Sequence, residues 1–311
     1  NKAFEKAGYV NAVEVRQQPD DATWEPGDIN YNTFRWITAG QGFAMGPSRV
    51  NPRTGQILDA DIIFDADFLQ YWRQEYETFT PQGIALLTGG PVTLDGYHEE
   101  LRRNPFAPEY RHGPLCACNL LAGKAYQLAL TQTVLAARTQ NKEDFEKLIM
   151  QALKDTTMHE VGHTLGLRHT FKASPYYSIE EANDIAKTSK TGLTASIMDY
   201  TPVNIVPKDM TQGDYYSTTI GPYDMWAIEY GYKPVAGGSP EGELEELQKI
   251  AARSGAPGHA YATDEDARGI DPDPTVNRWD FGKDPVAYAK MQAKLVAEAW
   301  PEIIDRLTEE G

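Results

Sequence analysis

Alternation of apolar and polar residues predicts strands in the first part of this 311-residue chain. Residues 33–38 place aromatic and polar side chains on alternate positions, which is typical of a half-buried strand. Residues 9–15 and 57–64 predict two more strands, and Asn-Pro-Arg-Thr-Gly at 51–55 predicts a turn before the last of them. Residues 1–8, ahead of these strands, are expected to be the end of a helix.

Helical spacing replaces this alternation further along the chain. The clearest example is a stripe of side chains three or four positions apart, made of Phe145, Ile149, Ala152, Thr156, His159 and His163. The opposite side of the last turns is also apolar, so this helix is expected to run through the interior. Further helices are predicted over 115–138, 223–230, 241–254 and 285–307.

The stripe ends in the sequence HEVGHTLGLRH, which begins at His159. On a helix His159 and His163 project from one face, one turn apart, as two ligands of one metal must. Glu160 lies beside that row, where a carboxylate can reach a metal-bound water without itself ligating the metal. Gly166 can adopt the left-handed conformation that ends a helix, which would return His169 as a third ligand. Three histidines leave one position open, so the spacing predicts a catalytic zinc site.

The pattern H-E-x-x-H-x-x-G-x-x-H resembles the motif of the metzincin clan of zinc endopeptidases, in which a methionine turn follows. The downstream sequence Ser-Ile-Met-Asp-Tyr supplies a methionine and a tyrosine at matching positions. In that clan the methionine forms a floor under the zinc-bound histidines, and the tyrosine of some members ligates zinc or stabilises the oxyanion. The residues with roles implied by the resemblance are Glu160 and Tyr200 (catalytic), His159, His163 and His169 (metal) and Met198 (Met-turn).

The resemblance also implies a fold and a setting. The expected fold is α+β, a metzincin-like zincin with a twisted mixed sheet, a central zinc-binding helix and a helical C-terminal part. A narrower group, the large secreted bacterial zinc-dependent metalloproteases, is similar over most of the chain, at residues 2–15, 31–37, 51–61, 159–174, 195–200 and 221–232. The chain is therefore expected to be the catalytic region of a longer secreted or cell-envelope protein.

Changes in composition predict two parts. Residues 1–233 are expected to form the catalytic domain, with an insertion at about 71–140. A segment rich in glycine and proline follows at 234–240, and residues 241–311 are expected to form a helical C-terminal extension. Within this extension the Asp- and Pro-rich residues 263–284 are expected to be irregular.

Charge and cysteine content limit the partners. The net charge of −16 opposes binding to nucleic acid or to an anionic membrane surface. No apolar run approaches the roughly 20 residues of a membrane-spanning helix. A disulfide between Cys116 and Cys118 would be strained at that spacing. Both are expected to be buried thiols, the alternatives being exposed redox thiols or a second metal site. The resemblance to metzincins implies a peptide or protein substrate as the partner, and the oligomeric state is left open.

Two further features of the predicted sheet are candidates for binding. Carboxylates cluster around the third strand and are candidate ligands for calcium, or else a solvent-facing acidic run: Asp59, Asp61, Asp65 and Asp67. Residues 42–50 are the candidate sheet edge to which an extended substrate would add as a strand, the alternative being an ordinary covered edge.

The sequence thus predicts a zinc-dependent endopeptidase that uses a metal-activated water, with Glu160 as general base. Two alternatives stay open. A non-catalytic zinc-stabilised peptide-binding module would keep the histidines for folding, and a zinc hydrolase of non-peptide substrates would share every residue of the motif.

Overall fold

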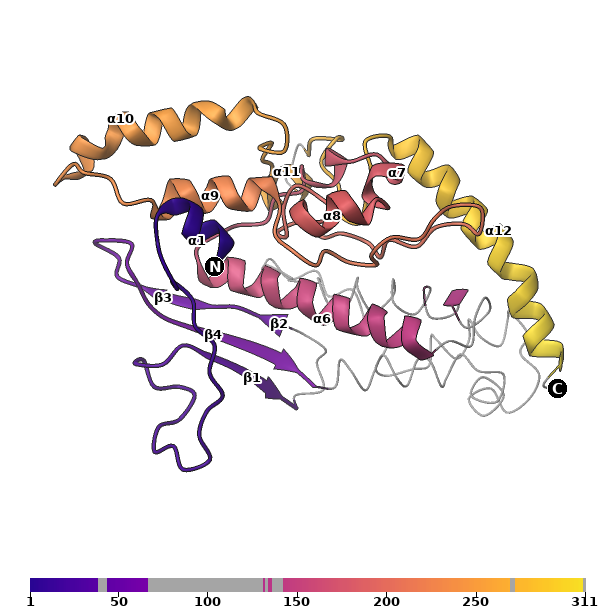
Figure 1. Cartoon of the computed structure of the whole chain (residues 1–311), viewed down its shortest axis with the longest axis horizontal. Helices are drawn as coiled ribbons and strands as arrows, with labels where there is room; N and C mark the ends of the chain where they lie inside the picture. The colour runs from indigo at the N-terminus through magenta and orange to yellow at the C-terminus, as the bar shows by residue number, and fades with distance from the viewer. Residues whose placement is uncertain (39–43, 67–130, 132–133, 136–141, 269–271, 310–311) are drawn as a thin grey trace.

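The computed structural model of the protein describes residues 1–38, 44–66, 131, 134–135, 142–268 and 272–309 (Figure 1). The architecture is α+β, as the sequence predicts. A small sheet forms one layer, the long helix α6 (Lys142–Thr164) lies across it, and the later helices α8 (Ile185–Thr191) and α9 (Pro222–Tyr232) lie on the far side of α6 (Figure 1).

The sheet is built around β4 (Ile57–Asp65). β1 (Thr33–Ile37) pairs with it in parallel on one side. β2 (Ala44–Met45) and β3 (Ser48–Val50) pair with it antiparallel on the other side, so the sheet is mixed. The predicted strands at 33–38 and 57–64 are therefore confirmed, as is the turn at 51–55.

The strand predicted at residues 9–15 is wrong, because this segment pairs with a side chain instead of a strand. The Asn1 amide group donates to the Val13 carbonyl at 2.9 Å and accepts from the Val13 N–H at 2.9 Å. Val13 and Val15 are exposed. Residues 9–15 have the apolar composition of a strand, but within the described parts of the chain they have neither a partner strand to pair with nor a surface to cover.

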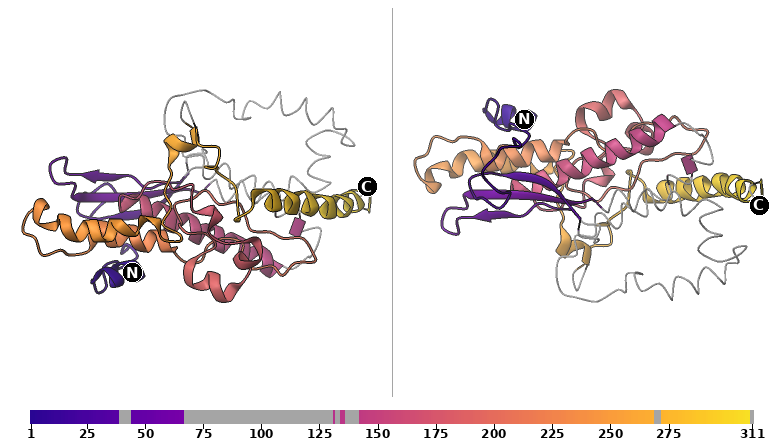
Figure 2. Two further views of the ribbon diagram at one scale, coloured as in Figure 1. Left: turned by 90° about the horizontal axis from the view of Figure 1, so that it is seen from above. Right: turned by 90° about the horizontal axis from the view of Figure 1, so that it is seen from below.

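The core lies between α6 and the sheet. Leu148 and Ala152 of α6 are fully buried against Phe64 of β4, which is also fully buried. Leu295 and Ala299 of α12 (Pro285–Glu309) belong to the same cluster, although α12 extends along the end of the molecule away from the sheet (Figures 1 and 2). This shared core is what holds the site-bearing helix in place.

The remaining elements surround α6. The helix α1 (Lys2–Ala7) packs on α9, with the rings of Phe4 and Tyr232 5.1 Å apart. Three short helices follow the motif or lie late in the chain: 3-10 helix η1 (Ser174–Tyr176), α7 (Ile179–Ala182) and α11 (Asp264–Arg268). α10 (Pro240–Ala251) continues into η2 (Ala252–Gly255).

The helices predicted at 223–230, 241–254 and 285–307 are confirmed as α9, α10 with η2, and α12. The predicted irregular segment 263–284 is wrong at its start, where α11 forms. Most of the expected insertion at 71–140, with Cys116 and Cys118, lies outside the described residues. The division into 1–233 and 241–311 stays a prediction.

None of the helices within the described ranges combines the length and the apolar character needed to cross a membrane.

Candidate metal centre

The helix α6 ends in a turn that only glycine accommodates easily. Gly166 has a φ of 85°, in the left-handed region. The Gly166 N–H donates to the His163 carbonyl at 2.9 Å, and the Leu167 N–H reaches back to the Gly162 carbonyl at 3.0 Å. These two bonds form a Schellman motif, which reverses the chain after the last helical turn. The predicted stop at Gly166 is therefore confirmed.

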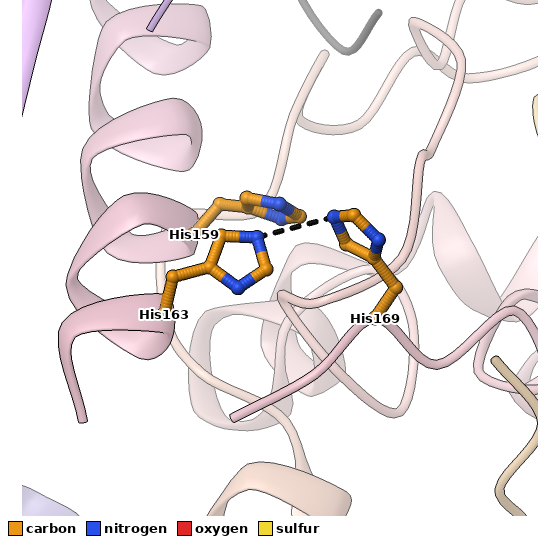
Figure 3. Close-up of side chains that lie close together, drawn as sticks. All are labelled: His159, His163 and His169. Atoms are coloured by element: carbon orange, nitrogen blue, oxygen red, sulfur yellow. Dashed lines mark hydrogen bonds between the residues drawn. The ribbon is translucent and has the colours of Figure 1, made fainter. Parts of the chain in front are cut away.

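This reversal brings three histidines together. His159 and His163 project from α6, and His169 faces them from the segment that follows the turn (Figure 3). One nitrogen from each ring lies within 4.8 Å of the other two, and this group could hold a metal ion. Across the described parts of the chain it is the only such cluster of three or more His, Cys, Asp or Glu side chains.

Each histidine ring is oriented by an acceptor at its Nδ1 atom. The acceptor for His159 is the Ile197 carbonyl at 2.8 Å, and for His163 it is the Leu167 carbonyl at 2.9 Å. A carbonyl oxygen can only accept, so both Nδ1 atoms carry the proton. In a neutral ring the other nitrogen, Nε2, then presents a lone pair.

The third ring is held in the same way by a carboxylate, since His169 Nδ1 lies 2.6 Å from Asp264 Oδ2. The Nε2 atoms of His163 and His169 are 3.1 Å apart (Figure 3). Two lone pairs facing each other at this distance repel unless a cation lies between them. Burial, followed by the electrostatic influence of His169, lowers the pKa of His163 to about 4, which disfavours a proton on His163 itself.

The donor set fits zinc. Tetrahedral coordination with Zn–N bonds of about 2.0–2.1 Å places ligand nitrogens about 3.3 Å apart, close to the distance between His163 and His169. Neutral imidazoles are among the ligands that zinc prefers, and three of them leave a fourth position open. The geometry therefore suits a catalytic rather than a closed structural site.

Glu160 is buried on α6, beside His159. The turn between β2 and β3 comes very close to it, because a Cβ added to Gly46 would lie 2.4 Å from the Glu160 carbonyl oxygen. Only glycine permits that approach. The antiparallel edge of the sheet is thus fixed next to the residue that the motif assigns as the base. Of the candidate edge at 42–50, residues 44–50 are described, and their role in substrate binding stays a prediction.

Met198 is fully buried and packs against the helix between the two histidines. A Cβ added to Gly162 would lie 2.3 Å from the Met198 sulfur. The Met198 carbonyl accepts from Thr170 N–H at 3.1 Å, so the residue also contacts the segment that carries His169. Met198 is therefore in contact with both chain segments that supply histidines.

Asp224 of α9 supports this turn, and the sequence analysis missed it. Its buried carboxylate accepts from Ser196 Oγ at 2.5 Å, from Ile197 N–H at 2.9 Å and from Gly221 N–H at 2.7 Å. Burial raises the pKa of Asp224 to about 6, although the three hydrogen bonds oppose that shift. Asp224 thus holds the segment whose Ile197 carbonyl orients His159.

Tyr200 is buried with its ring beside the histidines. The ring centroid lies 4.7 Å from that of His169 and 5.7 Å from that of His159. The ring of Trp279 also lies 5.5 Å from that of Tyr200, and the Trp279 backbone N–H donates to the Tyr200 carbonyl at 2.9 Å. The sequence-predicted residues His159, Glu160, His163, His169, Met198 and Tyr200 therefore lie in one region.

A late segment completes this region, and the sequence gives no signal for it beyond the acidic composition of 263–284. We call residues 260–268 and 272–282 the C-terminal strap. The Phe171 N–H donates to the Ala262 carbonyl at 2.7 Å, and Arg168 pairs with Glu265 at 2.7 Å. Asp264, which contacts His169, also belongs to it.

The acidic cluster near β4 has separate partners. Asp59 pairs with Arg49 at 3.1 Å, and Asp61 accepts from Thr33 Oγ1 at 2.6 Å. Asp65 is fully buried, and Asp67 lies outside the described residues. A calcium site among them stays a prediction.

A sheet crossed by a helix that carries two of three clustered histidines defines a zinc-metalloprotease-like architecture. In agreement with this, residues 141–311, more than half of the chain, match the model of a family described as Met-zincin. The chain belongs to the Met-zincin family. Comparison with curated proteins and with solved structures gave no match.

Proposed function

We propose that this protein is a zinc-dependent endopeptidase. The observation that carries the proposal is the convergence of one ring nitrogen from each of His159, His163 and His169, while the Nδ1 atom of each ring faces a hydrogen-bond acceptor. Membership of the Met-zincin family supports a metalloprotease in general. Cleavage within a chain, rather than at its ends, is the finer part of the proposal.

His159, His163 and His169 would hold the zinc. Zinc in such a site supplies a Lewis acid and lowers the pKa of its water towards about 7. Glu160 would accept the proton of the attacking water and deliver it to the leaving amine nitrogen. The Tyr200 hydroxyl would donate to the substrate carbonyl oxygen as it becomes negative, and Met198 would form the floor of the site, as a Met-turn does.

The substrate backbone would bind along the edge formed by β2 and β3. This edge is antiparallel to β4 and reaches Glu160 through the close approach of Gly46. An extended peptide adds to such an edge mainly through backbone hydrogen bonds. A site of this kind accepts many sequences, which suits unfolded or extended protein substrates. A secreted or envelope location remains part of the proposal.

The test is cleavage of a denatured protein by wild type and by Glu160→Gln, with zinc content measured for both. We expect Glu160→Gln to lose about 10²–10⁴-fold in activity, since general acid–base catalysis contributes that much, while retaining one zinc per chain. Glu146→Gln, at an exposed position on the same helix, is the matched control and should cleave like wild type. Mass spectrometry of the fragments distinguishes internal from terminal cleavage.

The outcomes separate the alternatives. Zinc binding and stable peptide binding without cleavage would support the non-catalytic module. Chelator-sensitive hydrolysis of an ester or amide with no cleavage of any peptide would support a hydrolase of other substrates. Full peptidase activity in Glu160→Gln would exclude Glu160 as the base.

A further inference from the structure

The acceptor at Nδ1 of His169 is a carboxylate, whereas the acceptors at Nδ1 of His159 and His163 are backbone carbonyls. The carbonyl that His163 faces is 4 residues further along the chain, and the one that His159 faces is 38 residues further along. His169 faces the carboxylate of Asp264, which comes from 95 residues further along. The Asp264 side chain is one-fifth exposed, and that of His169 is almost completely buried.

The atoms in contact determine what Asp264 can do. Its Oδ2 lies 2.6 Å from Nδ1 of His169, on the side of the ring away from the cluster. The carboxylate therefore accepts the Nδ1 proton and leaves Nε2 as the ligand atom. A charge-assisted bond of this kind is about twice as strong as a neutral one, and it fixes the orientation of the ring.

The position of Asp264 is fixed by its own helix. Asp264 is the first residue of α11, and Asp266 Oδ2 accepts from the Thr263 N–H at 2.8 Å. The Ala267 N–H donates to the Thr263 carbonyl at 3.2 Å, which completes the first turn. Asp264 is thus presented by an ordered turn, which limits how far its carboxylate can move from His169.

The strap is attached to the segment that carries His169. Four interactions join residues 168–174 and Tyr200 to the strap, on both sides of Asp264. Before and beside Asp264, the Phe171 N–H donates to the Ala262 carbonyl and Arg168 pairs with Glu265. After it, the Trp279 N–H donates to the Tyr200 carbonyl and the Gly282 N–H donates to the Ser174 carbonyl. Phe171, Tyr200, Ala262 and Val276 form a buried apolar cluster beneath these bonds. The strap and the third histidine therefore form one packed unit.

We propose that Asp264 is a positioning residue for the metal centre, which fixes the tautomer and ring orientation of His169 and strengthens its bond to zinc. This inference rests on the proposed function in one respect, that the three histidines hold zinc. It extends the centre into the C-terminal part of the chain. Partners of this kind typically account for 10–100-fold in metal affinity.

The test measures zinc binding by the full chain, using competition with a chromophoric chelator, for wild type, Asp264→Ala and Asp264→Asn. Glu265→Gln is the matched control, because Glu265 is the next residue and bonds the strap to Arg168 without touching a histidine. The visible spectrum of the cobalt-substituted proteins reports the geometry of the ligands. Thermal unfolding of the metal-free proteins reports the fold.

We expect Asp264→Ala to bind zinc about 10–100-fold more weakly and to change the cobalt spectrum. Asp264→Asn should lose less affinity, because its amide oxygen can still accept the His169 proton. Glu265→Gln should bind within about twofold of wild type, since it breaks only an exposed ion pair. If Asp264→Ala does not fold, an intermediate affinity of Asp264→Asn with unchanged metal-free unfolding carries the proposal.

Wild-type zinc affinity in both Asp264 variants would overturn the proposal. An equal loss in Glu265→Gln would also overturn it, because the effect would then belong to strap attachment and not to the contact with His169. Peptide cleavage is not among these measurements. A protein whose zinc affinity depends on Asp264 but which cleaves nothing would refute the endopeptidase and leave the positioning role intact.

Discussion

The helix side and the remote side of the metal centre are built differently. On the helix side, His159 and His163 are set four residues apart by α6, which is anchored in the main core through Leu148 and Ala152. On the remote side, His169 depends on a left-handed turn at Gly166 and on contacts with the strap. Helix geometry alone aligns two ligands, whereas the third needs chain from almost 100 residues away.

The same contrast extends to the supports of the rings. Backbone carbonyls orient the histidines of the helix: that of Leu167 lies four residues after His163, and that of Ile197 belongs to the buried turn that Asp224 holds. A side chain of the strap orients His169, and the strap is attached partly by exposed ion pairs such as Arg168–Glu265. Such pairs contribute little stability in water. The remote side should therefore be easier to perturb by substitution than the helix side.

The largest effect is expected from removing a ligand on the helix side. The zinc affinity of His163→Ala should fall by more than the 10–100-fold expected when a supporting residue is removed. All chelator-sensitive cleavage should be lost with the zinc. Zinc content after dialysis checks this expectation. His259→Ala is the control, since His259 stacks on Trp226, outside the cluster, and should retain zinc. Full zinc content in His163→Ala would show that α6 does not provide two ligands.

The turn that supports the helix side can be tested through the pH dependence of Asp224, which holds the segment whose Ile197 carbonyl orients His159. Its pKa of about 6 in the folded protein exceeds its ordinary value of 3.8, so the folded state holds this proton more tightly than the unfolded chain does. The free energy of unfolding should therefore fall as pH rises from about 4 to about 6, and stay lower above that window. The total change is at most about 3 kcal/mol.

Asp224→Asn does not titrate at this position, so it isolates that contribution. The stability of wild type relative to Asp224→Asn should decline across the same window in metal-free protein, measured by denaturant unfolding at each pH. A difference that is constant from pH 4 to 7 would contradict the raised pKa. A difference that grows with pH would mean that the hydrogen bonds from Ser196, Ile197 and Gly221 outweigh burial.

Sequence and structure agree best where the determinants are local. The spacing of His159 and His163 and the stop at Gly166 follow from the geometry of one helix and one turn, and could be predicted. Asp264 and Asp224 could not, because the sequence around an aspartate does not indicate which distant residue its carboxylate will contact. The strand predicted at residues 9–15 was wrong for a related reason, since a strand needs a partner strand and the composition of a segment does not reveal one.

The contact between the sheet edge and the helix side is tested by Gly46→Ala. The added Cβ would clash with the Glu160 carbonyl oxygen, so the β2–β3 turn must move away from α6. We expect a loss of about 1–3 kcal/mol in the free energy of unfolding, as for other overpacked sites, with a larger fall in peptide cleavage than in zinc affinity. Gly27→Ala, which meets no atom within 4 Å, should match wild type. Unchanged cleavage in Gly46→Ala would separate the sheet edge from the site.

The smallest effect, and the one whose sign is most informative, concerns Gly162 within α6. Alanine is favoured over glycine inside a helix by about 0.5–1 kcal/mol, yet a Cβ here would meet the sulfur of fully buried Met198. Gly162→Ala should therefore destabilise the wild-type background. In a Met198→Ala background the contact is gone, and the same change should stabilise by up to about 1 kcal/mol. A double-mutant cycle measured by denaturant unfolding gives the coupling, and additive effects would show that Met198 does not press on the helix between the two histidines.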